Sequence, residues 1–150
     1  MRIGKELRFE AAHVLPKHPG KCKNLHGHSY VVYLEIEGPI DHETGMVLDY
    51  VDLKRVLHEQ VYAKLDHRFI NDVFLEESWP GETTAENIVM YIWRHVESPL
   101  VSLGARVTRV RVCETATSWA ERTVEDGPKS SDHYGVQEGA TKHESAEESV

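Results

Sequence analysis

Apolar and polar positions near the N-terminus predict two β-strands. The first is the segment IGKELRFEAAH, which ends at His13, and the second is SYVVYLEIEG, which starts at Ser29. The loop between them contains two prolines and two glycines, which are residues that favour turns. We expect the two strands to pair as an antiparallel hairpin.

A spacing of apolar side chains close to 3.6 residues predicts two helices in the middle of the chain. The first covers DYVDLKRVLHEQVYAKL, residues 49–65, with Asp49 as its N-cap. The second covers TTAENIVMYIWRHVESPL, residues 83–100, where Thr83 and Glu86 fit a capping box. Both segments carry an apolar stripe along one side.

A third strand pattern occupies ARVTRVRVCET, residues 105–115. One face carries Thr108, Val110 and Val112, and the other face carries Arg109 and Arg111. Glu114 falls on the apolar face, so its carboxylate is aimed at the core. The segment TSWAERTV that follows is predicted to be a partner strand, which gives the order ββααββ.

The length of 150 residues fits about one domain, which we place at residues 1–125. Residues 126–150 have almost no large apolar side chains, which predicts a disordered acidic tail. This tail contains six acids and two bases, and it contributes half of the formal net charge of −8. The negative charge argues against a nucleic-acid-binding surface, which needs a basic field.

Two further features concern the location of the protein. No stretch reaches the roughly 18 apolar residues of a membrane span, and the N-terminus lacks the apolar run of a signal peptide. Cys22 and Cys113 are the two cysteines, so the sequence contains no disulfide framework. We therefore expect a soluble, cytoplasmic protein with no membrane partner and with both thiols reduced.

Three histidines are candidate metal ligands. His26 and His28 are two residues apart, so they point the same way if the second strand begins near Leu25. Antiparallel pairing would bring His13 beside them. Three neutral nitrogen ligands are typical of a catalytic zinc site with an open coordination position. The competing interpretation is chance, because ten histidines produce some close spacings.

The other six histidines are interpreted as loop, helix-surface or tail residues. They are His18, His42, His58, His95, His133 and His143.

Cys22 is a candidate reactive thiol. It lies between Lys21 and Lys23 in a loop rich in proline and glycine. Neighbouring positive charges favour the thiolate, which is the nucleophilic and basic form. The alternative is that Cys22 is a fourth zinc ligand, which would close the metal site and make it structural.

Two carboxylates complete the candidate chemistry. Asp66 precedes His67, and such a pair can set the imidazole tautomer for proton transfer if it lies in a turn. The alternative is a helix C-terminus with a favourable cation. The buried position of Glu114 suits a planar, amidine-like partner, and a buried ion pair with Arg109 or Arg111 is the competing account.

Six motifs occur in an order that resembles a known family. They are Phe-x-Ala-Ala-His at 9–13, Cys-x-x-x-His-Gly-His at 22–28, Gly-Met-Val-Leu-Asp-Tyr at 45–50, Leu-Asp-His at 65–67, Thr-Ala-Glu-Asn at 84–87 and Glu-Thr-x-Thr at 114–117. Over residues 3–124 the chain resembles the 6-pyruvoyl-tetrahydropterin synthase superfamily, and most closely its 6-carboxy-5,6,7,8-tetrahydropterin synthase branch of queuosine biosynthesis.

The resemblance implies an α+β tunnelling fold (T-fold), a ββααββ subunit with an antiparallel sheet and two helices on one face. It also implies a homo-oligomer, a hexamer built from two trimers. The implied zinc ligands are His13, His26 and His28, and the implied catalytic residues are Cys22, Asp66 and His67. The implied substrate-binding residues are Glu114, Thr84 and Lys23. Thr83 stands where the family usually has proline, which predicts a local difference near the pterin.

The implied activity is the zinc-dependent conversion of 7,8-dihydroneopterin triphosphate to 6-carboxy-5,6,7,8-tetrahydropterin, with release of acetaldehyde and triphosphate. One alternative is a sister enzyme that stops at 6-pyruvoyl-tetrahydropterin. The run ETATSWAE at 114–121 resembles the carboxy branch more closely. A further alternative is a non-catalytic module that binds zinc or pterin.

Overall fold

Two long strands form the centre of the fold. In the computed structural model, which describes residues 1–127, β1 (Arg2–His13) and β2 (His26–Glu37) pair antiparallel along their whole length. The hairpin predicted from the sequence is confirmed. Because β2 already begins at His26, both of its histidines lie within the strand. The predicted acidic tail lies outside the described residues from position 128 onward.

Three further strands complete a five-stranded sheet in the order β3-β1-β2-β4-β5. β4 (Arg106–Thr115) pairs antiparallel with β2, and β5 (Ser118–Thr123) pairs antiparallel with β4. The two-residue strand β3 (Arg68–Phe69) pairs in parallel with the end of β1. The sheet is therefore mixed, whereas an antiparallel sheet was expected. The parallel strand β3 was missed because two residues are too few to show an alternating pattern of apolar and polar side chains.

The first predicted helix is one continuous helical run. It consists of α1 (Tyr50–Leu57), a π-helical segment η2 (His58–Tyr62) and α2 (Ala63–Leu65). The Asp49 side chain accepts a hydrogen bond of 2.8 Å from the backbone N–H of Val51, so the predicted N-cap is confirmed.

The second predicted helix is α4 (Ala85–Ser102), and its predicted N-cap is wrong by one residue. The cap is Thr84, whose Oγ1 accepts from the backbone N–H of Asn87 at 3.4 Å. Thr83 does not cap the helix because its side chain is buried and its hydroxyl donates to the carbonyl of Val14 at 3.1 Å.

Three short helices were not predicted from the sequence, because each is too short to show a helical period. They are η1 (Lys21–Lys23), α3 (Ile70–Glu76) and η3 (Val124–Asp126).

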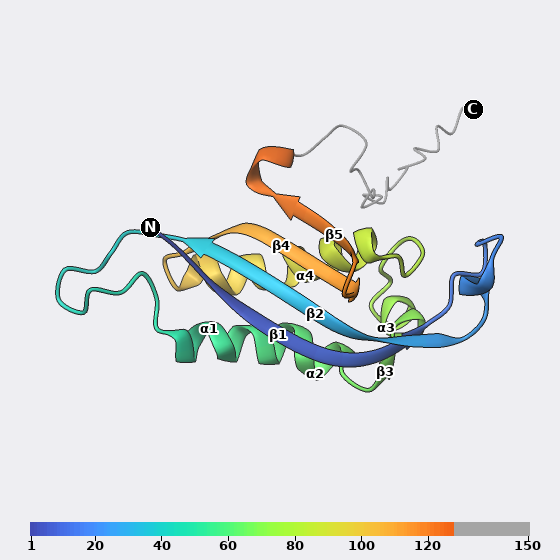
Figure 1. Ribbon diagram of the computed structural model, residues 1–150. Coiled ribbons are helices and arrows are strands. Elements are labelled where there is room, and N and C mark those ends of the chain that lie inside the picture. The colour runs from blue at the N-terminus through green and yellow to red at the C-terminus, as the bar shows by residue number, and fades with distance from the viewer. Residues whose placement is uncertain (128–150) are drawn as a thin grey trace, which may run out of the picture.

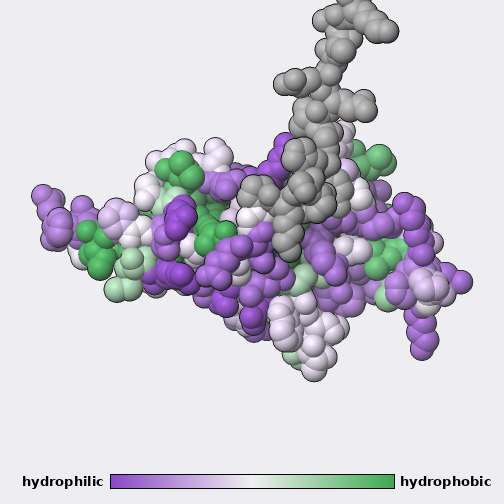
Figure 2. Space-filling view, turned by 90° about the horizontal axis from the view of Figure 1, so that it is seen from above, coloured by the Kyte–Doolittle hydropathy of each residue, from purple (hydrophilic) through white to green (hydrophobic). Residues whose placement is uncertain are grey.

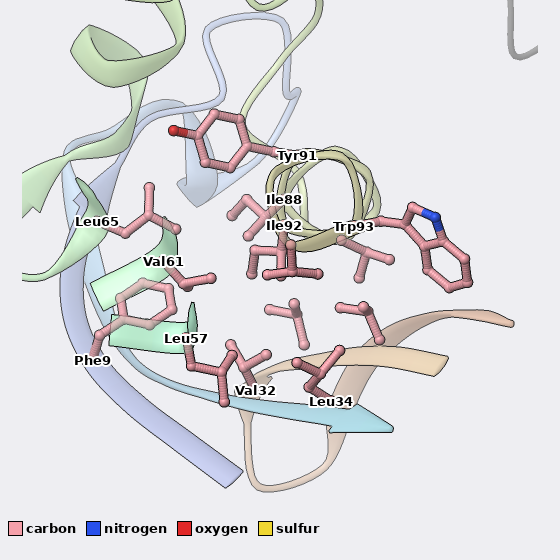
Figure 3. Packing of buried hydrophobic residues seen from close by; sticks show 14 of the residues in the cluster. Phe9, Val32, Leu34, Leu57, Val61, Leu65, Ile88, Tyr91, Ile92 and Trp93 are labelled. Carbon is pink, nitrogen blue, oxygen red and sulfur yellow. The ribbon is translucent and has the colours of Figure 1, made fainter. Parts of the chain in front are cut away.

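The helices cover one face of the sheet (Figure 1), and the core lies between the two layers. Figure 3 shows strand side chains pointing toward side chains of the helical run and of α4. Its labelled residues are at most 6% exposed: Phe9, Val32, Leu34, Leu57, Val61, Leu65, Ile88, Tyr91, Ile92 and Trp93. Burial of each such side chain contributes about 1.5–3 kcal/mol relative to leaving it exposed. The predicted α+β class is confirmed.

The other face of the sheet carries charged side chains. Arg109 pairs with Glu35 and Glu121 on the neighbouring strands, and Arg111 Nε donates to Glu121 at 2.7 Å. These guanidinium groups lie on the face away from Glu114. The competing account, in which either arginine forms a buried ion pair with Glu114, is therefore wrong.

His95 in α4 is a correction to the sequence interpretation, which placed it on a helix surface. Its side chain is only 18% exposed, and its Nε2 lies 2.8 Å from Glu77 Oε2. Lys64 Nζ donates to the other oxygen of the same carboxylate at 2.7 Å. This network ties α2, the end of α3 and α4 together.

The molecular surface is mainly polar on the face that is visible from above Figure 1. Outside the grey atoms, hydrophobic residues gather there in separate small patches (Figure 2). Within residues 1–127, no helix combines the length and apolar character that crossing a bilayer requires.

Candidate active site

The three candidate histidines meet at one end of the β1–β2 hairpin. The strand register places His13 directly opposite His26, and His28 follows two residues later on the same face. One ring nitrogen of each histidine lies within 4.8 Å of the corresponding atoms of the other two. The predicted convergence of the three imidazoles is therefore confirmed, and the group is positioned to bind a metal ion.

Hydrogen bonds fix the tautomers of two of these rings. His13 Nδ1 lies 2.8 Å from the carbonyl oxygen of Thr83, and His26 Nδ1 lies 2.8 Å from that of Asn24. Carbonyl oxygens only accept, so in the neutral rings the hydrogen is on Nδ1 and Nε2 carries a lone pair. The two Nε2 atoms are 3.0 Å apart. Two lone pairs at this distance repel each other unless a cation lies between them, so the donor set fits a metal ion.

The charge state of the rings agrees with that role. Burial lowers the pKa of His13 and also that of His28, and the neighbouring His26 imidazole lowers both pKa values further. Neutral imidazole is the form that coordinates a metal. The lowered pKa values favour the neutral form of His13 and His28, and neutral ligands leave a divalent ion its full positive charge.

Glu114 approaches the histidines from β4. Its side chain is 24% exposed, and its Oε1 lies 4.0 Å from His13 Nε2. Burial raises the pKa of Glu114, although the nearby His13 acts in the opposite direction. The carboxylate predicted on the core face is thus present beside the metal-ligand group, in a place where an N–H donor from a ligand would stabilise its charge.

Asp66 and His67 lie in the turn that the pair requires. Asp66 Oδ2 is 2.7 Å from His67 Nδ1, and Asp66 Oδ1 accepts from the backbone N–H of Glu10 at 3.0 Å. The backbone N–H of Glu10 lowers the pKa of Asp66, and His67 lowers it further. The imidazole is 79% exposed, and His67 has a φ of 54°, a left-handed backbone conformation that is uncommon for residues other than glycine.

Two cavities adjoin His28. One of about 490 Å³ is lined by His28, His67, Arg68, Glu10 and Ser29 among others. Another of about 530 Å³ is lined by His28, Glu114 and Arg8 among others. His67 and Glu114 therefore line separate spaces that both reach His28, one of the three converging histidines.

The remaining candidate residues lie around this centre. Cys22 is in η1, is partly buried, and lines neither of the two cavities. Within residues 1–127 its thiol does not join the converging metal-ligand group, so the fourth-ligand alternative has no support in the geometry. Lys23 is exposed in the same 3₁₀ turn. Thr84 caps α4, directly after the residue whose carbonyl holds His13.

Sequence reasoning missed the residues that support the histidines. Thr83 and Asn24 act through backbone carbonyl groups, which every residue has, so no side-chain pattern identifies them. Asn71 binds the backbone of Val14 across 57 positions. No local sequence pattern indicates such a contact.

The chain matches known proteins over nearly all of the described residues. A family model described as 6-pyruvoyl tetrahydropterin synthase matches residues 2–125. A protein of Archaeoglobus fulgidus, provisionally named 6-carboxy-5,6,7,8-tetrahydropterin synthase, is 43% identical over 121 residues, which cover 81% of this chain and 94% of that relative. A 6-carboxy-5,6,7,8-tetrahydropterin synthase of Synechocystis sp. is 42% identical over 122 residues, covering 79% and 89%.

The structure of Caenorhabditis elegans 6-pyruvoyl tetrahydropterin synthase is similar to this one, with a TM-score of 0.70 and 26% identity. The alignment covers 82% of this chain and 94% of that chain. The tunnelling fold expected from the sequence motifs is thereby confirmed. From the family match and the two relatives above 40% identity, this chain belongs to the 6-pyruvoyl tetrahydropterin synthase family, a family of enzymes.

Proposed function

We propose that this chain is a 6-carboxy-5,6,7,8-tetrahydropterin synthase of queuosine biosynthesis. It would convert 7,8-dihydroneopterin triphosphate to 6-carboxytetrahydropterin and release acetaldehyde and triphosphate. One observation carries the proposal: three imidazoles converge beside a partly buried carboxylate, in a chain whose two reported relatives above 40% identity bear this enzyme name.

The metal ion in the proposal is zinc, held by His13, His26 and His28. Three histidine ligands leave a coordination position open, and a zinc ion there would act as a Lewis acid toward the substrate side chain. Each histidine contributes one ring nitrogen, and the three nitrogens lie within 4.8 Å of one another.

The pterin ring would bind to Glu114. Its carboxylate would accept two hydrogen bonds, from the 2-amino group and from N3–H, and so fix the orientation of the ring. Burial of Glu114 supports this role, because two N–H donors would replace the hydration that the carboxylate has lost. Thr84, at the start of α4, and the exposed Lys23 are the further substrate-binding residues of the proposal.

Proton transfer would fall to Cys22 and to the Asp66–His67 pair. Asp66 orients the ring of His67 through Nδ1, which leaves Nε2 to take up or release a proton. Cys22 would act as a thiolate base on the substrate side chain. The cavity that contains both His28 and His67 supports the placement of His67 near the reacting side chain.

We propose that the enzyme is a homo-oligomer, a hexamer of two trimers. The outer edge of β5 pairs with no other strand within residues 1–127, and Trp119 on that strand is 57% exposed. An unpaired edge with an exposed aromatic side chain favours pairing with another subunit. Light scattering coupled to size-exclusion chromatography tests this state. The cytoplasmic location stays a prediction.

The activity is tested by incubating the purified chain with 7,8-dihydroneopterin triphosphate, with and without a chelator. Release of acetaldehyde that the chelator abolishes and zinc restores supports the proposal. The alternative, a 6-pyruvoyl-tetrahydropterin synthase, predicts a pyruvoyl product by mass spectrometry and no acetaldehyde. A non-catalytic module predicts bound metal or pterin without turnover.

A further inference from the structure

The end of β1 is held by a side chain from α3. Val14 is the first residue after the strand, and its N–H donates to Asn71 Oδ1 at 3.0 Å while its carbonyl accepts from Asn71 Nδ2 at 2.9 Å. One amide therefore pairs both backbone groups of Val14, as a neighbouring strand would. This double contact fixes the backbone immediately after His13.

Thr83 joins the same contact from a third segment. The residue is 1% exposed, and its Oγ1 lies 3.1 Å from the Val14 carbonyl and 3.3 Å from Asn71 Oδ1. Both neighbours are acceptors, so the hydroxyl hydrogen has two partners and no access to water. The backbone of Thr83 is therefore fixed relative to the end of β1.

This arrangement aims the Thr83 carbonyl at His13. The carbonyl accepts from His13 Nδ1 at 2.8 Å, in a buried contact that spans 70 positions. The second ligand is held differently, because His26 Nδ1 donates to the carbonyl of Asn24 only two residues away in an exposed loop. Among these two rings, His13 is the one whose orientation depends on tertiary contacts.

We propose that Asn71 and Thr83 are positioning residues that fix the tautomer and the ring orientation of His13 for metal binding. The inference rests on the metal site of the proposed function. Without the Thr83 hydroxyl, the carbonyl can move away from Nδ1, and the His13 ring can place its hydrogen on Nε2, the atom that faces the metal position. Loss of such a supporting contact typically lowers metal affinity about 10- to 100-fold.

The test compares full-length Thr83→Val, Thr83→Ser and Asn71→Asp with the wild type. Thr108→Val is the matched control, because Thr108 in β4 is also a buried threonine, 3% exposed, and its Oγ1 has no hydrogen-bond partner within residues 1–127. The first measurement is the affinity for Zn²⁺ by competition with a chelator, together with the visible spectrum of bound Co²⁺. The second is nitrogen-15 NMR of the imidazoles in the metal-free protein, which reports the His13 tautomer directly.

The expected result is a loss of Zn²⁺ affinity of at least about 10-fold in Thr83→Val and Asn71→Asp. Their His13 ring should show a mixture of tautomers, whereas Thr83→Ser and Thr108→Val should resemble the wild type. If Thr83→Val and Asn71→Asp match the control in affinity, Co²⁺ spectrum and tautomer, the inference is overturned while the metal site stands. A wild-type chain that binds no metal overturns the proposed function and this inference together.

Discussion

Glu114 Oε1 lies 4.0 Å from His13 Nε2, so the carboxylate that we propose to bind the pterin and the first proposed metal ligand are neighbours on one face of the sheet. They come from β4 and β1, which do not pair with each other; β2 lies between them. A ligand that contacts Glu114 with its ring therefore has its side chain close to the metal position.

The role of Glu114 is tested by Glu114→Gln, which keeps the size of the side chain and removes its charge. Replacing one charged acceptor by an amide should weaken pterin binding by about 1.5–3 kcal/mol, roughly 10- to 100-fold, because the bonds to two N–H donors lose their charge assistance. KM and the product dissociation constant measure the effect. Glu43→Gln, in an exposed loop, is the control. Equal affinities in both variants would contradict the assignment.

Removal of one imidazole should empty the metal site. His28→Ala should bring the bound zinc from about one per chain to near zero, because two neutral ligands hold the ion weakly. Activity should disappear with the metal. Atomic absorption after dialysis gives the metal content, and His42→Ala in an exposed loop should keep the full amount. A His28→Ala chain that retains zinc would mean that other groups bind it.

Cys22→Ala separates the reactive thiol from a metal ligand. We expect kcat to fall by about 100-fold or more, because the proposed base is lost, while the zinc content stays near one per chain. Metal analysis and acetaldehyde release on the same sample provide the comparison. Loss of zinc together with the thiol would make Cys22 a ligand and the site structural.

Asp66→Asn tests the orientation of His67. The amide keeps an oxygen for the N–H of Glu10, yet it no longer holds the imidazole as a charged acceptor. We expect kcat to decrease about 100-fold with little change in KM, since the pair contributes to proton transfer and not to ring binding. Asp72→Asn on the exposed side of α3 is the control. A change confined to KM would assign Asp66 to substrate binding instead.

Glu77 should make the stability of the fold depend on acid. Burial alone would raise the pKa of Glu77, but the polar contacts with Lys64, Tyr91 and His95 together outweigh it, and the pKa lies below its usual value. A carboxyl with a lowered folded pKa stabilises the protein above the unfolded pKa of about 4.3, and this stabilisation is lost as pH falls through the folded pKa.

The corresponding variant is Glu77→Gln. At pH 7 it should lower the free energy of unfolding by about 1 kcal/mol, and the difference from the wild type should shrink as the pH falls from about 5 to about 3. Urea denaturation at one fixed protein concentration measures it, because an oligomer's stability depends on concentration. Glu59→Gln, on the solvent side of η2, should show a much smaller pH effect. A difference that stays constant with pH would refute the prediction.

The sequence by itself determined the parts of this protein that depend on local periodicity and on adjacent strands. The two long strands, the two main helices and the inward position of Glu114 follow from which residues repeat every two or every 3.6 positions. Pairing of consecutive strands was then enough to bring His13 to His26, because a hairpin fixes which residues face each other.

Only the tertiary structure decided what holds these groups in place. The parallel strand β3, the contact of Glu77 with His95, and the contact of Asn71 and Thr83 with Val14 join segments between 18 and 69 positions apart. Such contacts leave no local pattern in the sequence. An asparagine or threonine that binds solvent cannot be distinguished by its sequence neighbours from one that binds a distant backbone group. The residues to which we assign the chemistry were therefore visible in the sequence, and those that we propose to orient them became visible when packing of the core brought the distant segments together.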